Sequence, residues 1–141
     1  MSNGKIKRRI ICTEENIKKI SKENMQLWEE YKDDMYLRKA DKAENTLKNY
    51  KSSIFAFLIW LSDNYGANKT IVEIDHRIVK RYLSYCQIEL GNRGKRRNNK
   101  TSAISSLLNY LVREDYIQFN PLTNKLVRAD IEGENIIEHT F

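Results

Sequence analysis

Apolar residues recur every three or four positions along most of this chain, and few glycines or prolines interrupt them. This spacing is that of amphipathic helices and predicts helices throughout. Thr13 followed by Glu14 and Glu15 is a good N-cap with acids in the first turn, so we expect a helical stretch from there to about Arg38. A break near residues 21–24 fits the pattern. The apolar stripe consists of Ile17, Ile20, Leu27, Trp28, Tyr31 and Met35.

A second helix is predicted from about Asn45 to Asn64, after a connection at residues 39–43 and before Gly66, which suits a helix end. Its second half is apolar on all sides, so we expect it at the centre of the core. Its core-facing stripe consists of Leu47, Tyr50, Ile54, Phe57, Leu58 and Leu61. Its first half presents an open polar face made of Asn45, Lys48, Asn49 and Ser52.

Two further helices follow. Asp75 is a suitable N-cap for a third helix over residues 76–90, which two glycines end. The fourth helix is predicted over residues 95–114, with its apolar stripe at Ile104, Leu107, Leu108 and Leu111. Asn120 before Pro121 is a stop signal, and residues 122–141 are predicted to be an extended, acidic tail. The whole pattern predicts an all-α fold.

The positive charge is concentrated in two segments. The formal net charge is +6, while residues 1–9 carry four basic side chains and residues 91–101 carry five, with no acid in either segment. Focused positive charge is typical of a protein that binds a polyanion. For an isolated basic run, a solvated loop with no partner is the competing interpretation.

The sequence of the fourth helix favours the interpretation that the protein binds a polyanion. Its open face holds small polar groups and no acid before Glu114, and a basic cluster precedes it. Small hydroxyl and amide side chains allow a nucleic-acid backbone to approach and can donate to phosphate oxygens or base edges. A helix N-terminus also favours anions. This face consists of Lys95, Asn98, Ser102, Ser105, Ser106, Asn109 and Arg113.

The remaining chemistry is sparse. The two histidines and two cysteines have no metal-ligand spacing, and no nucleophile motif or tuned pair of acids is present, so we expect no metal, no cofactor and no small-molecule substrate. No apolar run is long enough to cross a membrane. Cys12 and Cys86 are expected to be reduced thiols in a cytoplasmic protein. Cys12, close to basic residues, is either an exposed arm residue or a thiol with a lowered pKa.

An ordered set of short segments resembles the core-binding domain of tyrosine recombinases, the phage integrases. The resemblance covers roughly residues 20–125, and no single segment of it is specific. The set runs Asn45-Thr-Leu-Lys-Asn-Tyr50, Phe57, Trp60-Leu61, Ile74-Asp75, Tyr82-Leu83, a glycine turn with Arg93 and Arg96-Arg97, Ser102-Ala103-Ile104-Ser105-Ser106, and Asn120-Pro121.

The resemblance implies a small SAM-like bundle of four to five helices that clamps recombination-site DNA. It implies that the second and fourth long helices lie near the major groove, with Lys48, Asn49, Ser52, Arg96, Arg97, Lys100, Thr101 and Ser105 facing the DNA. The family's catalytic set of Arg, Lys, His-x-x-Arg and nucleophilic Tyr has no counterpart here. We therefore expect a fragment or standalone module of a bacterial or phage recombinase, nucleoid-associated, with no DNA cleavage of its own.

Together the two arguments predict a basic arm at residues 1–12, a DNA-binding domain at 13–125 and a linker at 126–141. Its partners are double-stranded DNA and, on it, other recombinase protomers. The arm is either a further DNA contact or an unstructured tail. For the whole protein, the alternative functions are a helical transcription regulator or a protein adaptor that uses the apolar stripe of residues 17–35 as its contact. The predicted DNA contacts are Lys48, Asn49, Ser52, Arg93, Lys95, Arg96, Arg97, Lys100, Thr101, Ser102, Ser105 and Asn109, with Lys5, Lys7, Arg8 and Arg9 in the arm.

Overall fold

The computed structural model describes residue 10 and residues 12–88 and 95–123, without the side chains of residues 88, 95–99 and 123. This described part contains helices and no strand, which confirms the predicted all-α class. Two short 3-10 turns join helices, η2 at Ala40–Lys42 and η3 at Ile71–Glu73, and a third, η4 at Pro121–Thr123, follows the last α-helix. The α-helices are α1 at Glu14–Ile17, α2 at Lys22–Lys39, α3 at Ala43–Tyr65, α4 at His76–Ile88 and α5 at Lys95–Arg113.

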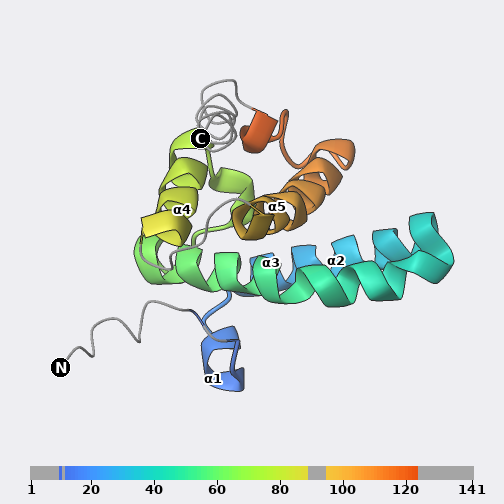
Figure 1. Cartoon of the computed structure of the whole chain (residues 1–141), viewed down its shortest axis with the longest axis horizontal. Coiled ribbons are helices and arrows are strands. Elements are labelled where there is room, and N and C mark those ends of the chain that lie inside the picture. Colours follow the sequence, from blue (N-terminus) through green and yellow to red (C-terminus); the bar gives the residue numbers. More distant parts are fainter. Residues whose placement is uncertain (1–9, 11, 89–94, 124–141) are drawn as a thin grey trace.

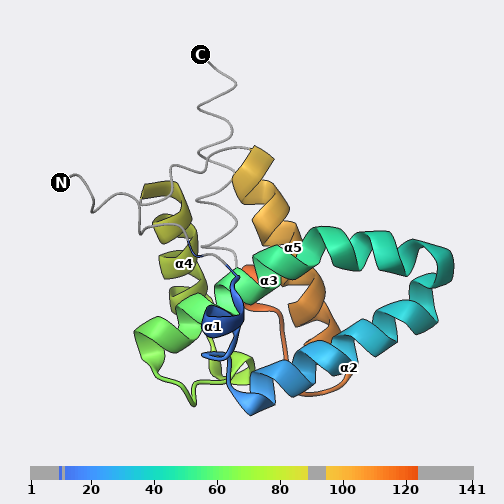
Figure 2. The same ribbon diagram turned by 90° about the horizontal axis from the view of Figure 1, so that it is seen from below.

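Helices α2 and α3 form an antiparallel hairpin whose tip is η2, and the two helices diverge from that tip (Figure 2). Helix α5 lies across both of them and packs most extensively on α3 (Figure 1). Helix α4 lies beside the first half of α5, at the end of the molecule far from the hairpin tip. The crossing of α5 over the hairpin therefore determines which polar side chains of three helices share one surface.

The helix ends follow the capping residues. Thr13 Oγ1 accepts from the Asn16 amide at 3.1 Å and begins α1, and Asp75 Oδ1 accepts from the amides of Arg77 and Ile78 at the start of α4. The expected break in the first stretch is present because Ser21 caps a new helix, α2, by accepting from the Asn24 amide at 3.1 Å. These caps confirm the predictions made at Thr13 and Asp75.

Two residues with positive φ shape the turns. Gly66 ends α3 with φ of 105°, a backbone conformation that side chains other than glycine rarely adopt. Ala40 has φ of 45°, caps the end of α2 and is the first residue of η2, where the chain reverses direction. The predicted connection at residues 39–43 is thus a tight helical turn, and α3 begins two residues earlier than expected.

The core contains a cluster of aromatic rings between α2, α3 and α4, which packs together with the apolar stripe of α5. The Phe57 ring meets Tyr82 edge-on at 4.8 Å between centroids, and Trp28 meets Phe55 in the same manner at 5.1 Å. Because Leu27, Trp28 and most of the apolar stripe of α2 are buried in this cluster, the stripe is not available to an outside protein. The adaptor alternative that relied on residues 17–35 is therefore wrong.

The start of the predicted tail is also part of the domain. Leu122 is 1% exposed and packs in the core, within η4. The expectation of an extended tail from residue 122 onward is therefore wrong at residues 122–123, which belong to η4, and residues 124–141 lie outside the described part. No described helix is long and apolar enough to cross a membrane.

The packing of α5 predicts a large loss of stability when a side chain of its apolar stripe is truncated. Leu108 is fully buried, so Leu108→Ala removes core contacts and leaves a cavity, and we expect a loss of about 3 kcal/mol in the free energy of unfolding. Urea denaturation followed by circular dichroism measures this loss. Leu37→Ala is the control, since Leu37 is 86% exposed, and it should change stability by less than about 0.5 kcal/mol. Equal effects of the two variants would contradict the packing described.

Candidate nucleic-acid interface

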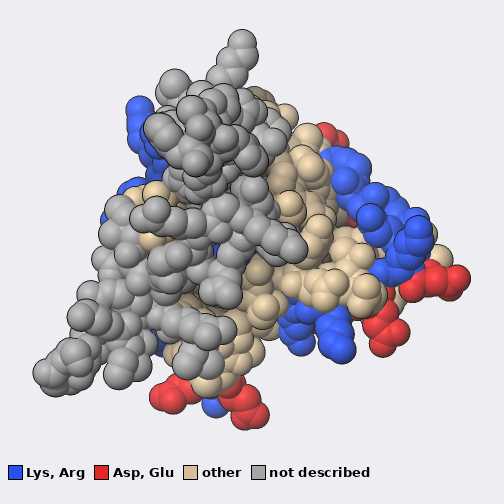
Figure 3. All heavy atoms as spheres, viewed as in Figure 1, with Lys and Arg blue, Asp and Glu red and all other residues tan. Residues whose placement is uncertain are grey.

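A polar groove of about 420 Å³ follows the side of α5 that faces the end of α2. Its floor is formed by short hydroxyl and amide side chains, and its rim by long basic ones. Figure 3 shows Lys and Arg side chains gathered between the end of α5 and the α2–α3 turn, with an uncharged surface on one side of them and acidic side chains near the turn. The groove is lined by Arg38, Lys39, Thr101, Ser102, Ser105, Ser106, Asn109 and Arg113.

The basic rim is held by one carboxylate. Asp34 Oδ2 accepts from Arg38 Nε at 2.8 Å and from Arg113 Nη2 at 2.9 Å. Arg38 lies one turn further along α2, whereas Arg113 ends α5, so this bridge joins the two helices. The guanidinium of Arg113 also lies 5.9 Å from the Tyr110 ring centroid. The two arginines are thereby fixed in position at the edge of the groove.

The centre of the α5 face is tied to α2 by a pair of hydroxyls. Tyr31 is fully buried, and its hydroxyl lies 2.8 Å from Ser106 Oγ. Burial raises the pKa of Tyr31, so its hydroxyl stays protonated at neutral pH and can donate. Ser106, which the sequence pattern placed on an open face, is half-buried and engaged within the protein.

The far edge of the same face is held by Asn120, which is buried. Its Nδ2 donates to Ser105 Oγ at 3.0 Å and to Asn109 Oδ1 at 2.9 Å, and lies 3.3 Å from the Ser105 carbonyl oxygen. Its Oδ1 accepts from the Leu122 amide at 2.8 Å. The residue that the sequence marked only as a stop signal thus orients two predicted DNA contacts.

A second hollow, of about 200 Å³, brings together predicted contacts from α3 and α5. Ser52 and Lys100 both line it, together with Cys12. The Cys12 thiol lies 3.7 Å from the Ser52 carbonyl oxygen, and burial raises the pKa of that thiol more than the nearby Lys51 lowers it. The prediction of a lowered pKa at Cys12 is therefore wrong, and neither Cys12 nor Cys86 forms a disulfide.

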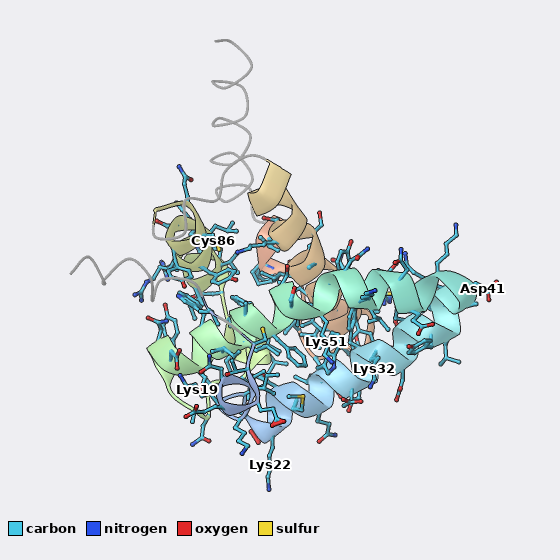
Figure 4. All side chains as sticks on the ribbon, turned by 60° about the horizontal axis from the view of Figure 1, so that its bottom comes forward. Lys19, Lys22, Lys32, Asp41, Lys51 and Cys86 are labelled. Carbon is cyan, nitrogen blue, oxygen red and sulfur yellow. The ribbon has the colours of Figure 1, made fainter. Side chains whose placement is uncertain are left out.

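The polar face of α3 is exposed as expected. Asn45, Lys48, Asn49 and Ser52 are all exposed, and none of the first three lines the groove or the hollow. Lys51, one position before Ser52, instead extends over the Phe55 ring, 5.4 Å from its centroid; Figure 4 labels it on α3. The α3 patch therefore adjoins the second hollow through Ser52.

Several of the predicted DNA contacts lie outside the described residues or the described side chains. Arg93 and the arm residues Lys5, Lys7, Arg8 and Arg9 lie outside the described residues. Lys95, Arg96 and Arg97 form the first turn of α5, and their side chains lie outside the described part. Thr101 is only 6% exposed, which leaves little surface for DNA, and we omit it from the proposed contacts.

Two rim residues, Arg38 and Lys39, were missed at the level of sequence. They lie in the last turn of α2, and no local sequence pattern distinguishes them from basic residues at the ends of other helices. Across the described ranges, no three His, Cys, Asp or Glu side chains gather closely enough to hold a metal ion. The site is thus a surface of hydroxyls, amides and cations.

Comparison with protein families gives a direct match. The model described as phage integrase, N-terminal SAM-like domain, matches residues 27–118, well over half of the chain. The chain belongs to this family. The match spans α2 through α5 and contains every described side chain of the groove, and the family is that of the DNA-binding, core-binding domain of integrases. No curated protein and no solved structure matched the chain.

The hydrogen bonds of Asn120 predict a defined effect of its removal. Asn120→Ala leaves the Leu122 amide and Asn109 Oδ1 without this partner, so we expect a loss of about 2 kcal/mol in the free energy of unfolding. Thermal and urea denaturation measure this loss. Gln118→Ala, in the same loop and exposed, is the control and should change stability by less than about 0.5 kcal/mol. Stability unchanged in Asn120→Ala would contradict the role of Asn120 as a clamp on α5.

Proposed function

We propose that this domain binds double-stranded DNA through α5 and the first half of α3, as the core-binding domain of a site-specific tyrosine recombinase. The observation that carries the proposal is the groove along α5, where serine and asparagine side chains form the floor and arginine and lysine the rim. A phosphate backbone can approach such a floor closely, because the serine and asparagine side chains that form it are short.

The cations and the small polar groups have different tasks. Lys39 on one side of α5 and Lys100 on the other supply contacts that neutralise phosphates and do not depend on sequence. Arg38 and Arg113 lie on the same side as Lys39 and are paired with Asp34. Ser102 and Asn109 are exposed between these cations and are the groups positioned to reach base edges. Adding the basic first turn of α5 gives a contact surface along the whole helix.

The ties to Tyr31 and Asn120 support the same function. A side chain that is already held in one orientation loses less conformational entropy when it meets its partner. Ser105 and Asn109 are held by Asn120, and Ser106 is held by Tyr31. The α5 surface is thus ordered before DNA arrives.

In the recombinase, this domain closes on one side of the recombination-site DNA, opposite the catalytic domain, and presents the scissile phosphate to it. This proposed role rests on membership of the integrase N-terminal domain family. The domain itself supplies binding and positioning, and cleavage belongs to the catalytic domain. Neighbouring recombinase protomers on the same DNA are the further partners of the assembly.

The proposal predicts salt-dependent DNA binding that the start of α5 controls. If about five phosphates are neutralised, the logarithm of the association constant falls with the logarithm of salt concentration at a slope of roughly −4 to −5. Arg96→Glu combined with Arg97→Glu places two acids in the first turn of α5, so we expect at least a hundredfold weaker binding. Fluorescence anisotropy of a labelled duplex across salt concentrations measures both quantities.

A matched control reverses two charges elsewhere. Lys18→Glu combined with Lys22→Glu makes the same change in net charge at the α1–α2 corner, where Lys22 points into solvent (Figure 4). This variant should weaken binding less than about fivefold, through long-range repulsion alone. Retained affinity in the Arg96/Arg97 variant, with its fold intact by circular dichroism, would exclude the start of α5 as the DNA-binding surface.

A further inference from the structure

The bridge at the groove rim places a negative charge on the surface that is proposed to meet DNA. The side chain of Asp34 is 20% exposed, and those of Arg38 and Arg113 are 42% and 40% exposed. One carboxylate oxygen accepts from both guanidinium groups, at 2.8 and 2.9 Å. The carboxylate therefore occupies a position between two arginines that a phosphate oxygen could equally take.

We propose that Asp34 is a specificity-determining residue that lowers the affinity of the domain for DNA of arbitrary sequence. The proposal rests on the proposed DNA-binding function and deepens it. Binding to arbitrary sequence depends almost entirely on neutralising phosphates with free cations. With its partner carboxylate in place, the pair of arginines carries one net positive charge in place of two, and its donors at Arg38 Nε and Arg113 Nη2 are already used.

Because of the bridge, the two arginines contribute to DNA affinity only when a phosphate displaces Asp34. A phosphate held in register by base contacts along α5 can replace the Asp34 oxygen as acceptor, because phosphate and carboxylate accept from guanidinium in the same geometry. A duplex that lacks those base contacts holds no phosphate at this point long enough to displace a neighbouring carboxylate. Asp34 thereby increases the ratio of specific to non-specific affinity.

Asp34→Asn tests the proposal directly on duplex DNA of random sequence. Removing the charge frees both arginines, so the salt slope should become steeper by about one to two and binding at moderate salt should tighten by about tenfold. Asp33→Asn is the matched control. It makes the same change in net charge on the adjacent, exposed position of α2, which does not line the groove, and it should tighten binding by less than about twofold.

A second comparison remains decisive if Asp34→Asn disturbs the contact between α2 and α5. Arg38 and Lys39 both line the groove. Of these two residues, Arg38 forms an ion pair with a carboxylate, and no such pair is seen for Lys39 among the described residues. In the wild-type background, Lys39→Ala should weaken binding to random duplex several-fold. Arg38→Ala should weaken it less, because it removes one positive charge without removing a direct phosphate contact. Circular dichroism and melting temperature establish that each variant is folded.

The outcomes separate this inference from the function on which it rests. If the wild-type domain binds duplex DNA but Asp34→Asn behaves like Asp33→Asn, the inference is overturned and the proposed function stands. Weaker binding in a folded Asp34→Asn variant overturns it as well, because it shows that the bridge supports binding. If the wild-type domain and all variants fail to bind at low salt, the proposed function and the inference fail together.

Discussion

The structure depends on one crossing, that of α5 over the α2–α3 hairpin. The leucine stripe of α5 must be buried against both helices, and Leu107, Leu108 and Leu111 are each at most 1% exposed. Burying that stripe turns the opposite, polar side of α5 outward beside the end of α2. The Tyr31–Ser106 hydroxyl pair lies at this crossing and links α2 to α5. The groove is thus a consequence of core packing.

The charges of the molecule are organised around the same crossing. The rim of the groove takes its cations from two helices that are far apart in sequence, with Arg113 and Asp34 separated by 79 positions. An exposed ion pair contributes little to stability on its own, so this bridge matters more for where the guanidinium groups point than for how firmly the helices pack. A net charge of +6 attracts any polyanion, and local pairing of this kind is how a basic surface can remain selective.

Most of the fold was predictable because its signals are local. The caps at Thr13 and Asp75, the stop at Gly66 and the apolar stripes all depend on neighbouring residues, and the structure confirms them. The site was predictable only in part, because its ties are long-range. Periodicity placed Ser106 and Asn109 on an open face, but their partners Tyr31 and Asn120 come from other segments. The burial of Thr101 follows from the crossing of α5, which no local pattern specifies.

The central claim is that one face, made of α5 and the first half of α3, binds duplex DNA. An NMR titration of the isotopically labelled chain with a short duplex, at low and at moderate salt, tests it most directly. We predict amide shift changes that cluster at residues 45–52 and 95–109 and that decrease steeply as salt is raised. Shift changes centred on α1 and the start of α2, or none even at low salt, would contradict the claim.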